Sequence, residues 1–362
     1  MRIIKTLQSK NIASGWLYFY IHFVTEVICF YTLSIQVGDS IFLWAFPLMY
    51  DALAFVPQSL VGILSDKYPK IKLGSIGLFF LMLAGLMFWI LPGLSPYISL
   101  IVLCIGNALV HINGAEVTLR SSNGKLSHSA IFVAGGSFGL ITGRVLAGEG
   151  VPYWFVIALV FTAFPFSLLA ESYREKSDKE KYCPCENFDY VNLKISPSLI
   201  VFLAVFIVVV RGYMGYGIPT TWKKTVIQSI IFYFAMGVGK ALGGIFADSF
   251  GVKKTAIISA CSAVPFLLAG NNYMIISIIG VMLFSMTMSI TLAMLVSVFK
   301  NTPGLAFGWT TIGLFLGTAP IFFFRINTFF ANSLIIVLFT AFSVAAMCIV
   351  LRKDEKTQYE EH

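Results

Sequence analysis

The sequence predicts an all-α integral membrane protein of twelve transmembrane helices, arranged as two six-helix bundles related by pseudo-twofold symmetry. Of its 362 residues, 58% are hydrophobic and only 12% are charged, whereas about a quarter of the residues in a soluble domain are charged. Apolar runs long enough to cross a bilayer, about 20 residues each, recur along the whole chain. A short sequence motif in the first part of the chain also occurs in the second part.

With that length as the criterion, we expect twelve spans joined by short polar loops. Their predicted limits are 13–37, 40–64, 72–91, 96–119, 128–148, 152–170, 197–220, 226–247, 253–270, 273–299, 303–324 and 328–351. One long polar segment, 171–196, divides the first six spans from the last six. We therefore assign 1–170 to an N-terminal bundle, 171–196 to a cytoplasmic linker and 197–362 to a C-terminal bundle with a short tail.

The placement of positive charge predicts the orientation in the membrane. The net charge is +8, but the basic residues lie in alternate short loops, so we attribute the charge to membrane topology and expect no nucleic-acid partner. The loops on the opposite side carry only Lys223, Lys224 and Arg325. Because the basic side faces the cytoplasm, we expect both termini to be cytoplasmic, in a multi-pass protein of the cell membrane.

Cysteine usage predicts neither a disulfide framework nor a metal site. The six cysteines are scattered, and four of them lie inside apolar runs, as buried free thiols do. Cys183 and Cys185 form a close pair in the polar segment, but no third or fourth ligand is near them in the sequence. We therefore expect no metal and no cofactor.

The repeated motif combines a glycine, an aspartate, a turn and basic residues. It reads VGILSDKYPKIK over 61–72 and GGIFADSFGVKK over 243–254. The two copies follow the second predicted helix of each half, which indicates an internal repeat of two parallel halves. Glycine lets another helix approach closely. An aspartate is disfavoured at the C-terminal end of its own helix, so each should face the N-terminus of another helix.

The two copies of the motif resemble the cytoplasmic loop motif of the major facilitator superfamily. The matching residues are Gly62, Asp66 and Lys67 in the first copy, and Gly244, Asp248, Gly251, Lys253 and Lys254 in the second. Pro69 replaces a frequent glycine of the family pattern, and Ser249 replaces a usual basic residue. The resemblance extends over the twelve spans and their division into two sixes. It implies a secondary transporter that works by alternating access.

The resemblance also implies a contact for each motif aspartate. Asp66 should approach the helix that begins at Thr302–Pro303, and Asp248 the helix that begins near Ser127, each in the other half of the protein. Alternatively, the two carboxylates only accept hydrogen bonds from amides of their own loops. The basic residues of the motif are expected to meet lipid headgroups or cytoplasmic carboxylates.

Ionisable residues inside predicted spans are candidates for function, because an unpaired charge in a bilayer is costly. His22 and Glu26 are four residues apart and share one helix face. We predict that Glu26, together with His22, carries a coupled proton, and that Asp51 is the next candidate. The alternatives are a helix-packing hydrogen bond for the first pair and a structural ion pair for Asp51.

Arg211 is the main candidate for substrate binding. It interrupts an apolar run in the middle of the seventh span, and a guanidinium there is suited to a carboxylate or a phosphate. Its alternative role is a salt bridge to Glu26 or Asp51. The further candidates for substrate contact are Arg144, His111, Tyr213 and Tyr216. The alternative for Arg144 is an ion pair with Glu149.

Two other charged positions have structural interpretations. Glu116 and Arg120 are four residues apart, in the favourable order for an ion pair at the cytoplasmic end of their helix. Lys240 is expected to extend its ammonium toward the cytoplasmic surface.

Together these features predict a monomeric secondary active transporter of a small organic solute, anionic or zwitterionic, with proton coupling. A proton-coupled multidrug antiporter is the alternative, although Arg211 argues against cationic drugs. A nontransporting receptor or sensor is another, but the chain shows no soluble output domain. We expect no enzymatic activity, because no His-Glu-x-x-His motif, nucleophile elbow or phosphate-binding loop occurs.

Overall fold

A computed structural model describes residues 12–37, 45–91, 95–179, 185–324, 326 and 328–353, with backbone only at 37 and 172–179. The helices of the first half are α2 (Ile12–Val37), α3 (Ala45–Phe55), α4 (Gln58–Lys67), α5 (Leu73–Ile90), α6 (Pro96–Ser121), α7 (Ser127–Gly148) and α8 (Tyr153–Lys179). Those of the second half are α9 (Pro197–Gly217), α10 (Val226–Phe250), α11 (Val252–Ala269), α12 (Met274–Ser285), α13 (Thr287–Val298), α14 (Pro303–Thr318), η1 (Ala319–Phe322) and α15 (Phe329–Val350).

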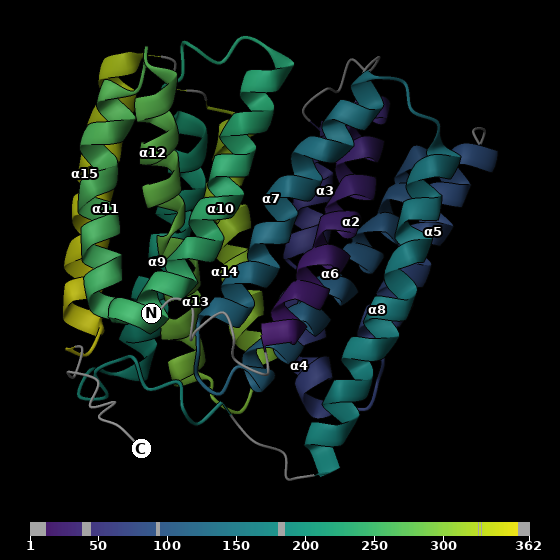
Figure 1. Cartoon of the computed structure of the whole chain (residues 1–362), viewed down its shortest axis with the longest axis horizontal. Helices are drawn as coiled ribbons and strands as arrows, with labels where there is room; N and C mark the ends of the chain where they lie inside the picture. The colour runs from purple at the N-terminus through teal and green to yellow at the C-terminus, as the bar shows by residue number, and fades with distance from the viewer. Residues whose placement is uncertain are drawn as a thin grey trace.

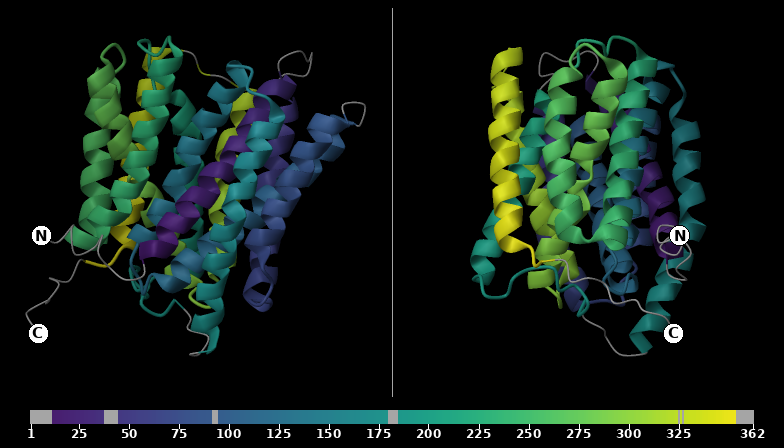
Figure 2. Two further views of the ribbon diagram at one scale, coloured as in Figure 1. Left: turned by 45° about the vertical axis from the view of Figure 1, so that its right-hand side comes forward. Right: turned by 60° about the vertical axis from the view of Figure 1, so that its left-hand side comes forward.

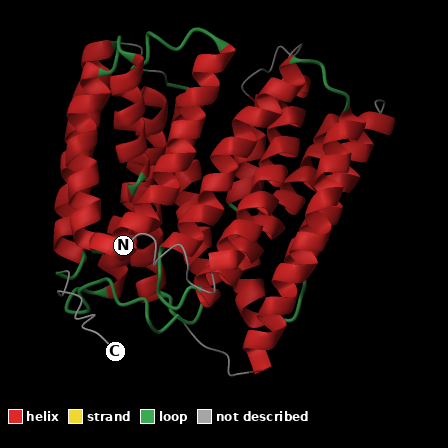
Figure 3. Cartoon of the chain, in the orientation of Figure 1, coloured by secondary structure: helices red, strands yellow, loops and turns green. Residues whose placement is uncertain are grey.

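Twelve stretches within the described ranges are helical, long and apolar enough to cross a membrane. Their limits agree with the predicted spans to within a few residues, so the prediction of an all-helical protein with twelve spans is confirmed. Figure 3 shows helices joined by loops throughout the described chain, where the only β contact is an isolated bridge between Val191 and Leu351.

The helices form two groups that follow the order of the chain. In Figure 1, α2–α8 lie on one side of the molecule and α9–α15 on the other. The side views show the helices of both groups running along one common direction (Figure 2). Across the division, α7 packs against α10, and α4 packs against α14. The end of the bundle that carries Asp66 and Asp248 is called the motif end below, and the opposite end the far end.

Two predicted spans each consist of two helices. The span Ala45–Lys67 is interrupted at Val56–Pro57, between α3 and α4, where proline has no amide hydrogen to continue the helix. The span Met274–Val298 is interrupted at Met286, between α12 and α13. One continuous helix was predicted in each place, and both predictions were wrong in this detail.

Two helix ends also differ from prediction. The helix that was expected to end at residue 170 continues as α8 to Lys179, because the segment ESYREKSDK is rich in residues that favour helix. The helix that was expected to reach residue 220 ends at Gly217, before Ile218 and Pro219.

The described part of the polar segment crosses the motif end. The amide of Cys185 donates to the carbonyl of Lys300 at 2.9 Å, and the amide of Asn192 donates to that of Val350 at 2.8 Å. Tyr190 donates its hydroxyl hydrogen to the carbonyl of Gly124 in the first half. Burial raises the pKa of the Cys185 thiol to about 12, so it stays protonated at neutral pH; Cys183 lies outside the described residues.

Candidate functional site

Glu26 lies at the centre of a buried cluster formed by α2 and α6. Its Oε1 atom accepts a hydrogen bond from Asn107 Nδ2 at 3.0 Å. The Nε2 atom of His111 lies 3.3 Å from the same oxygen, and that of His22 lies 3.8 Å away. His111 was predicted as a substrate contact, but the fold places it beside Glu26, closer than the helical neighbour His22.

The hydrogen bonds of the two imidazoles fix how they face Glu26. His22 Nδ1 lies 2.9 Å from the carbonyl oxygen of Phe132, and His111 Nδ1 lies 2.9 Å from that of Asn107. A carbonyl only accepts, so each Nδ1 carries the hydrogen. In a neutral ring Nε2 then holds a lone pair, and this lone pair faces a carboxylate oxygen. Such a contact is favourable only when a proton or a cation lies between the two atoms.

The cluster has the donor set of a proton site or of a divalent-metal site. One donor atom from each of His22, Glu26 and His111 lies within 4.8 Å of the others, and all three residues are buried. No metal site was predicted from the sequence, where only two cysteines lie close together. The cluster of His22, Glu26 and His111 was not predicted, because its residues come from two helices far apart in the sequence.

Glycines of α7 make room for the cluster. A Cβ atom on Gly136 would lie 2.5 Å from His22 Nε2, and one on Gly139 would lie 2.8 Å from Glu26 Cβ. Real Cβ atoms do not approach other atoms so closely, so any side chain at these positions would displace the histidine or the whole helix.

Arg211 lies beside two narrow cavities. The first is enclosed by helices of both halves and is lined by Arg211 of α9, Lys240 of α10 and hydroxyl groups of Ser129, Ser289, Thr291 and Thr310. The second lies within the C-terminal half and is lined by Arg211 together with Thr287, Thr340 and Ser343. Lys240 was predicted to reach the cytoplasmic surface; instead it lines the first cavity, because α10 presents it toward α7 and α13 rather than toward the motif end.

Both cations lack partners within the described part of the chain. Arg211 is 9% exposed, and its Nη1 atom is buried without a hydrogen-bond partner. Neither Arg211 nor Lys240 forms an ion pair there, so the alternative salt bridge from Arg211 to Glu26 or Asp51 is not formed. No described acidic residue lines either cavity. Lys240 is close enough to Arg211 and Glu26 to interact with both electrostatically.

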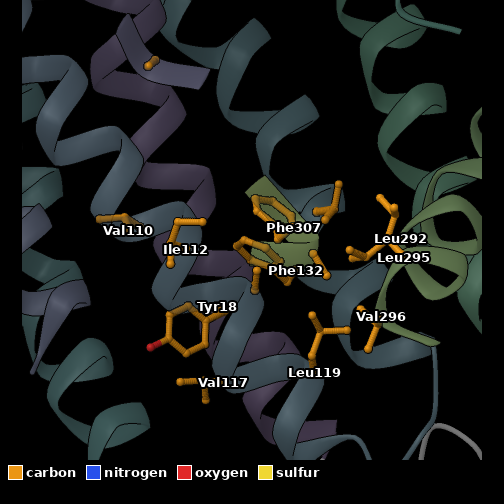
Figure 4. Packing of buried hydrophobic residues seen from close by; sticks show 14 of the residues in the cluster. Tyr18, Val110, Ile112, Val117, Leu119, Phe132, Leu292, Leu295, Val296 and Phe307 are labelled. Atoms are coloured by element: carbon orange, nitrogen blue, oxygen red, sulfur yellow. The ribbon is translucent and has the colours of Figure 1, made fainter. Parts of the chain in front are cut away.

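An aromatic pair stands between the Glu26 cluster and the first cavity. Phe132 of α7 and Phe307 of α14 face one another (Figure 4), with ring centroids 6.0 Å apart. The Phe132 ring also contacts the His22 ring, at 4.9 Å between centroids, and Phe307 lines the cavity. The pair therefore joins the two halves between a ring of the Glu26 cluster and the lining of the first cavity.

At the motif end, each motif aspartate accepts hydrogen bonds from the start of a helix in the other half. Asp66 accepts from the amides of Gly304 and Leu305 at 3.1 and 3.0 Å, at the N-terminus of α14. Asp248 accepts from the amides of Leu126 and Ser127 at 2.8 and 2.9 Å, at the N-terminus of α7. These are the two helix N-termini that the motif implied.

The motif glycines allow these contacts. A Cβ atom on Gly62 would lie 2.8 Å from the amide nitrogen of Leu305, and one on Gly244 would lie 2.7 Å from the carbonyl oxygen of Leu126. Gly251 adopts a φ of 103° at the turn from α10 to α11, a conformation that favours glycine.

The basic residues of the motif end pair with protein groups. Arg120 contacts Glu116 at 3.0 Å, as predicted, and Asp66 at 3.3 Å. Lys253 donates to the carbonyl of Leu351 at 3.0 Å, so it stabilises the C-terminal end of α15 rather than only meeting headgroups. The Lys67 ammonium lies 5.2 Å from the centre of the Tyr68 ring.

The far end carries a different contact between the halves. Arg144 of α7 donates to the Tyr233 hydroxyl of α10 at 3.3 Å, and its guanidinium lies 5.3 Å from the centre of the Phe30 ring. Its hydrogen bond thus goes to Tyr233, not to Glu149. Thr318 of α14 donates to Asp51 of α3 at 3.4 Å. Burial lowers the pKa of Lys223 in the adjacent loop, and the positive charge of Arg144 lowers it further.

The remaining predicted substrate contacts lie away from the cavities. Arg144, Tyr213 and Tyr216 line neither of the two cavities beside Arg211. Tyr216 is 64% exposed, because the helix turns that ring outward. Tyr213 packs against Phe339, with ring centroids 6.4 Å apart.

Fold and site define a multi-pass helical membrane protein whose two six-helix groups enclose a positively charged cavity. Solved structures of similar fold include FucP, a major facilitator superfamily transporter in the outward conformation, with a TM-score of 0.64 and 13% identity over 95% of this chain and 99% of that chain. The E. coli fucose:proton symporter FucP gives a TM-score of 0.66 and 12% identity over 94% and 99%.

The chain therefore has the fold of the major facilitator superfamily transporters, as the repeated motif predicted. No protein-family model and no curated protein matches the sequence.

Proposed function

We propose that the protein is a secondary active transporter that moves a small organic anion or zwitterion together with a proton by alternating access. The observation that carries this proposal is a pair of cations, Arg211 and Lys240, that line a cavity between the two halves and form no ion pair with any residue that the structure describes. An unpaired charge at this depth is costly and is retained where it has a use. We infer that the two cations are retained because they bind a substrate anion.

The Glu26 cluster supports proton coupling. Lys240 interacts electrostatically with both Glu26 and Arg211, so it links the acid to the cavity. When Glu26 takes up a proton, the cations lose a compensating negative charge and attract an anion more strongly. By linkage, a bound anion favours the protonated cluster to the same extent. Proton and anion then bind together and cross together, which is symport.

Two sets of contacts between the halves support alternating access. Asp66 and Asp248 hold the halves together at the motif end, and the Arg144–Tyr233 and Thr318–Asp51 contacts join them at the far end. Opening toward one side requires one set to separate while the other stays formed. We place the motif end in the cytoplasm of a cell-membrane protein, on the strength of the lysine and arginine distribution.

The multidrug alternative has no support in the cavity. A cationic drug would meet Arg211 and Lys240 with no described acidic residue on the lining. An E. coli protein of the same fold is a fucose:proton symporter, which is in keeping with proton coupling here but gives no information on the substrate.

The proposal is tested by solute-driven proton movement. The purified protein is reconstituted into liposomes that enclose a pH-sensitive dye, and a panel of small carboxylates, phosphate esters and amino acids is added outside. At least one anion should acidify the lumen with wild type and with Lys194→Gln, a change on an exposed residue of the polar segment. Arg211→Gln should abolish the signal. Absence of any solute-dependent signal with correctly folded protein would contradict the proposal.

A further inference from the structure

We propose that the cavity beside Arg211 selects a compact dianion, with one oxyanion group at Arg211 and a second negative charge at Lys240. This deepens the proposed function and rests on it only in treating the cavity as the transport site.

Two positive charges line the cavity. Arg211 is almost fully buried, and its Nη1 atom has no partner among the described residues. Lys240 is partly buried and lines the same cavity. A monoanion would compensate one cation and leave the other, and a neutral solute would compensate neither. A solute with two negative charges neutralises both.

The hydroxyl groups of the lining differ in their capacity to donate hydrogen bonds to a ligand. Thr291 and Thr310 donate their hydroxyl hydrogens to carbonyls of their own helices, Met288 and Phe307. Ser129 likewise donates to Leu126. The hydroxyl of Ser289, in contrast, is buried without a partner among the described residues. The described groups that are free to donate are thus Arg211, Lys240 and Ser289, and none of the described lining residues carries a carboxylate. Such a set recognises oxygen atoms that carry negative charge, rather than an amine.

The two cations also differ in what they can bind. A guanidinium presents a planar fork that matches a carboxylate or a phosphate with two hydrogen bonds, whereas an ammonium acts as a point charge. Arg211 therefore orients one oxyanion group, and Lys240 responds to the total charge. Both belong to the C-terminal half, while Ser129 of the N-terminal half also lines the cavity.

Binding in detergent solution tests this inference without transport. The probes are succinate, its singly charged amide succinamate, and glycerol 3-phosphate, each titrated calorimetrically into purified full-length protein. Wild type should bind succinate or glycerol 3-phosphate at least about tenfold more tightly than succinamate, the effect of one charge-assisted hydrogen bond. The two dianions distinguish a dicarboxylate from a phosphate monoester as the natural form.

Variants of Lys240 test whether this residue binds the second negative charge of the ligand. Lys240→Gln should bind succinate and succinamate with similar, weak affinity, while the exposed control Lys194→Gln keeps the wild-type preference. Size-exclusion chromatography and thermal unfolding confirm that each variant is folded. Binding of succinamate as tight as that of both dianions, binding of none of the three probes, or a preference that survives in Lys240→Gln would overturn the inference. Dianion binding without proton movement would instead overturn only the proposed function.

Discussion

The charged residues at the centre of the protein form an acidic group in one half and a basic group in the other. Glu26 is enclosed by His22, Asn107 and His111 in the N-terminal half. Arg211 and Lys240 belong to the C-terminal half, beyond the Phe132–Phe307 pair. A direct ion pair would satisfy both charges but would hold the protein in one state. Keeping the charges apart leaves each free to bind a ligand of opposite sign.

Replacing Glu26 by glutamine tests the proton site. Glu26→Gln has nearly the shape of the protonated acid, so proton-driven accumulation should be lost while exchange of solute across the membrane persists. The two activities are separated in liposomes by comparing uptake driven by a pH gradient with counterflow at equal pH. Glu149→Gln, on an exposed residue of the far end, is the matched control. Unchanged pH dependence in Glu26→Gln would exclude Glu26 and make Asp51 the next residue to examine.

A glycine of α7 offers a second test of the same cluster. In Gly136→Ala the new methyl group would lie 2.5 Å from His22 Nε2, so the imidazole must leave its place beside Glu26. We expect a loss of stability of about 1–3 kcal/mol, the usual cost of overpacking, together with weaker proton coupling. Gly148→Ala, on the same helix with nothing within 4 Å, should change neither. Equal thermal unfolding curves for the two variants would show that α7 does not confine the histidine.

The sequence predicted some of these residues and missed others for physical reasons. His22 and Glu26 could be paired because they share a helix turn. His111 and Lys240 could not be placed, because their partners lie on other helices and the sequence gives no rotation of one helix about another. Tyr216 was predicted to face the cavity from its nearness to Arg211, but residues five apart on a helix do not share a face.

At the level of helices, the halves are joined by carboxylates that bind helix N-termini. Each contact combines a glycine that lets two helices meet, an aspartate, and amides at the start of α14 or α7 that have no partner within their own helix. The contacts repeat because the sequence repeats. Their positions were predictable, since the motif fixes the aspartate and the helix starts follow from Pro303 and Ser127. The helix interruptions at Pro57 and Met286 were not predictable, because hydropathy alone does not distinguish one continuous helix from two consecutive helices.

Removing a motif carboxylate should favour opening at the motif end. Asp66→Asn keeps the size of the side chain but weakens its interaction with the start of α14 by about 1 kcal/mol, the scale of a charge at a helix terminus. The distance between spin labels at Lys70→Cys and Asn301→Cys, in a cysteine-free background, should show a larger long-distance population. Asp189→Asn, which removes an exposed ion pair with Arg352 at the same end, is the control and should have no effect. An identical distance distribution in Asp66→Asn would mean that the contact does not hold the halves together.

At the level of the whole molecule, charge placement and the even number of spans predict which side each loop faces. In a protein whose six cysteines are replaced by alanine, single cysteines are introduced as Glu186→Cys at the motif end and Tyr273→Cys at the far end. A membrane-impermeant maleimide added to intact cells should label the second and not the first, and both should react after the membrane is permeabilised. Labelling of Glu186→Cys from outside would reverse the predicted orientation. The native Cys185 is unsuited to this test, because its buried thiol has a pKa of about 12.

The fold was predictable to a greater extent than the site. Hydropathy and helix length determine twelve spans, because a bilayer admits few other structures. The site depends on which faces of α2, α6, α9 and α10 turn inward, and that depends on packing between helices far apart in the sequence. The assignment of 1–170, 171–196 and 197–362 as separate units stays a prediction, although α2–α8 and α9–α15 form two groups in Figure 1.

The central claim is that the two halves move against each other around the charged cavity, so that one end opens as the other closes. The most direct measurement compares two spin-label distances, one across the motif end between Lys70→Cys and Asn301→Cys, and one across the far end between Glu149→Cys and Ile227→Cys. Both are recorded with and without Asp66→Asn and Asp248→Asn combined. The account predicts that the combined change increases the open population at the motif end and decreases it at the far end. Opening at both ends together, or no opening at the motif end, would contradict it.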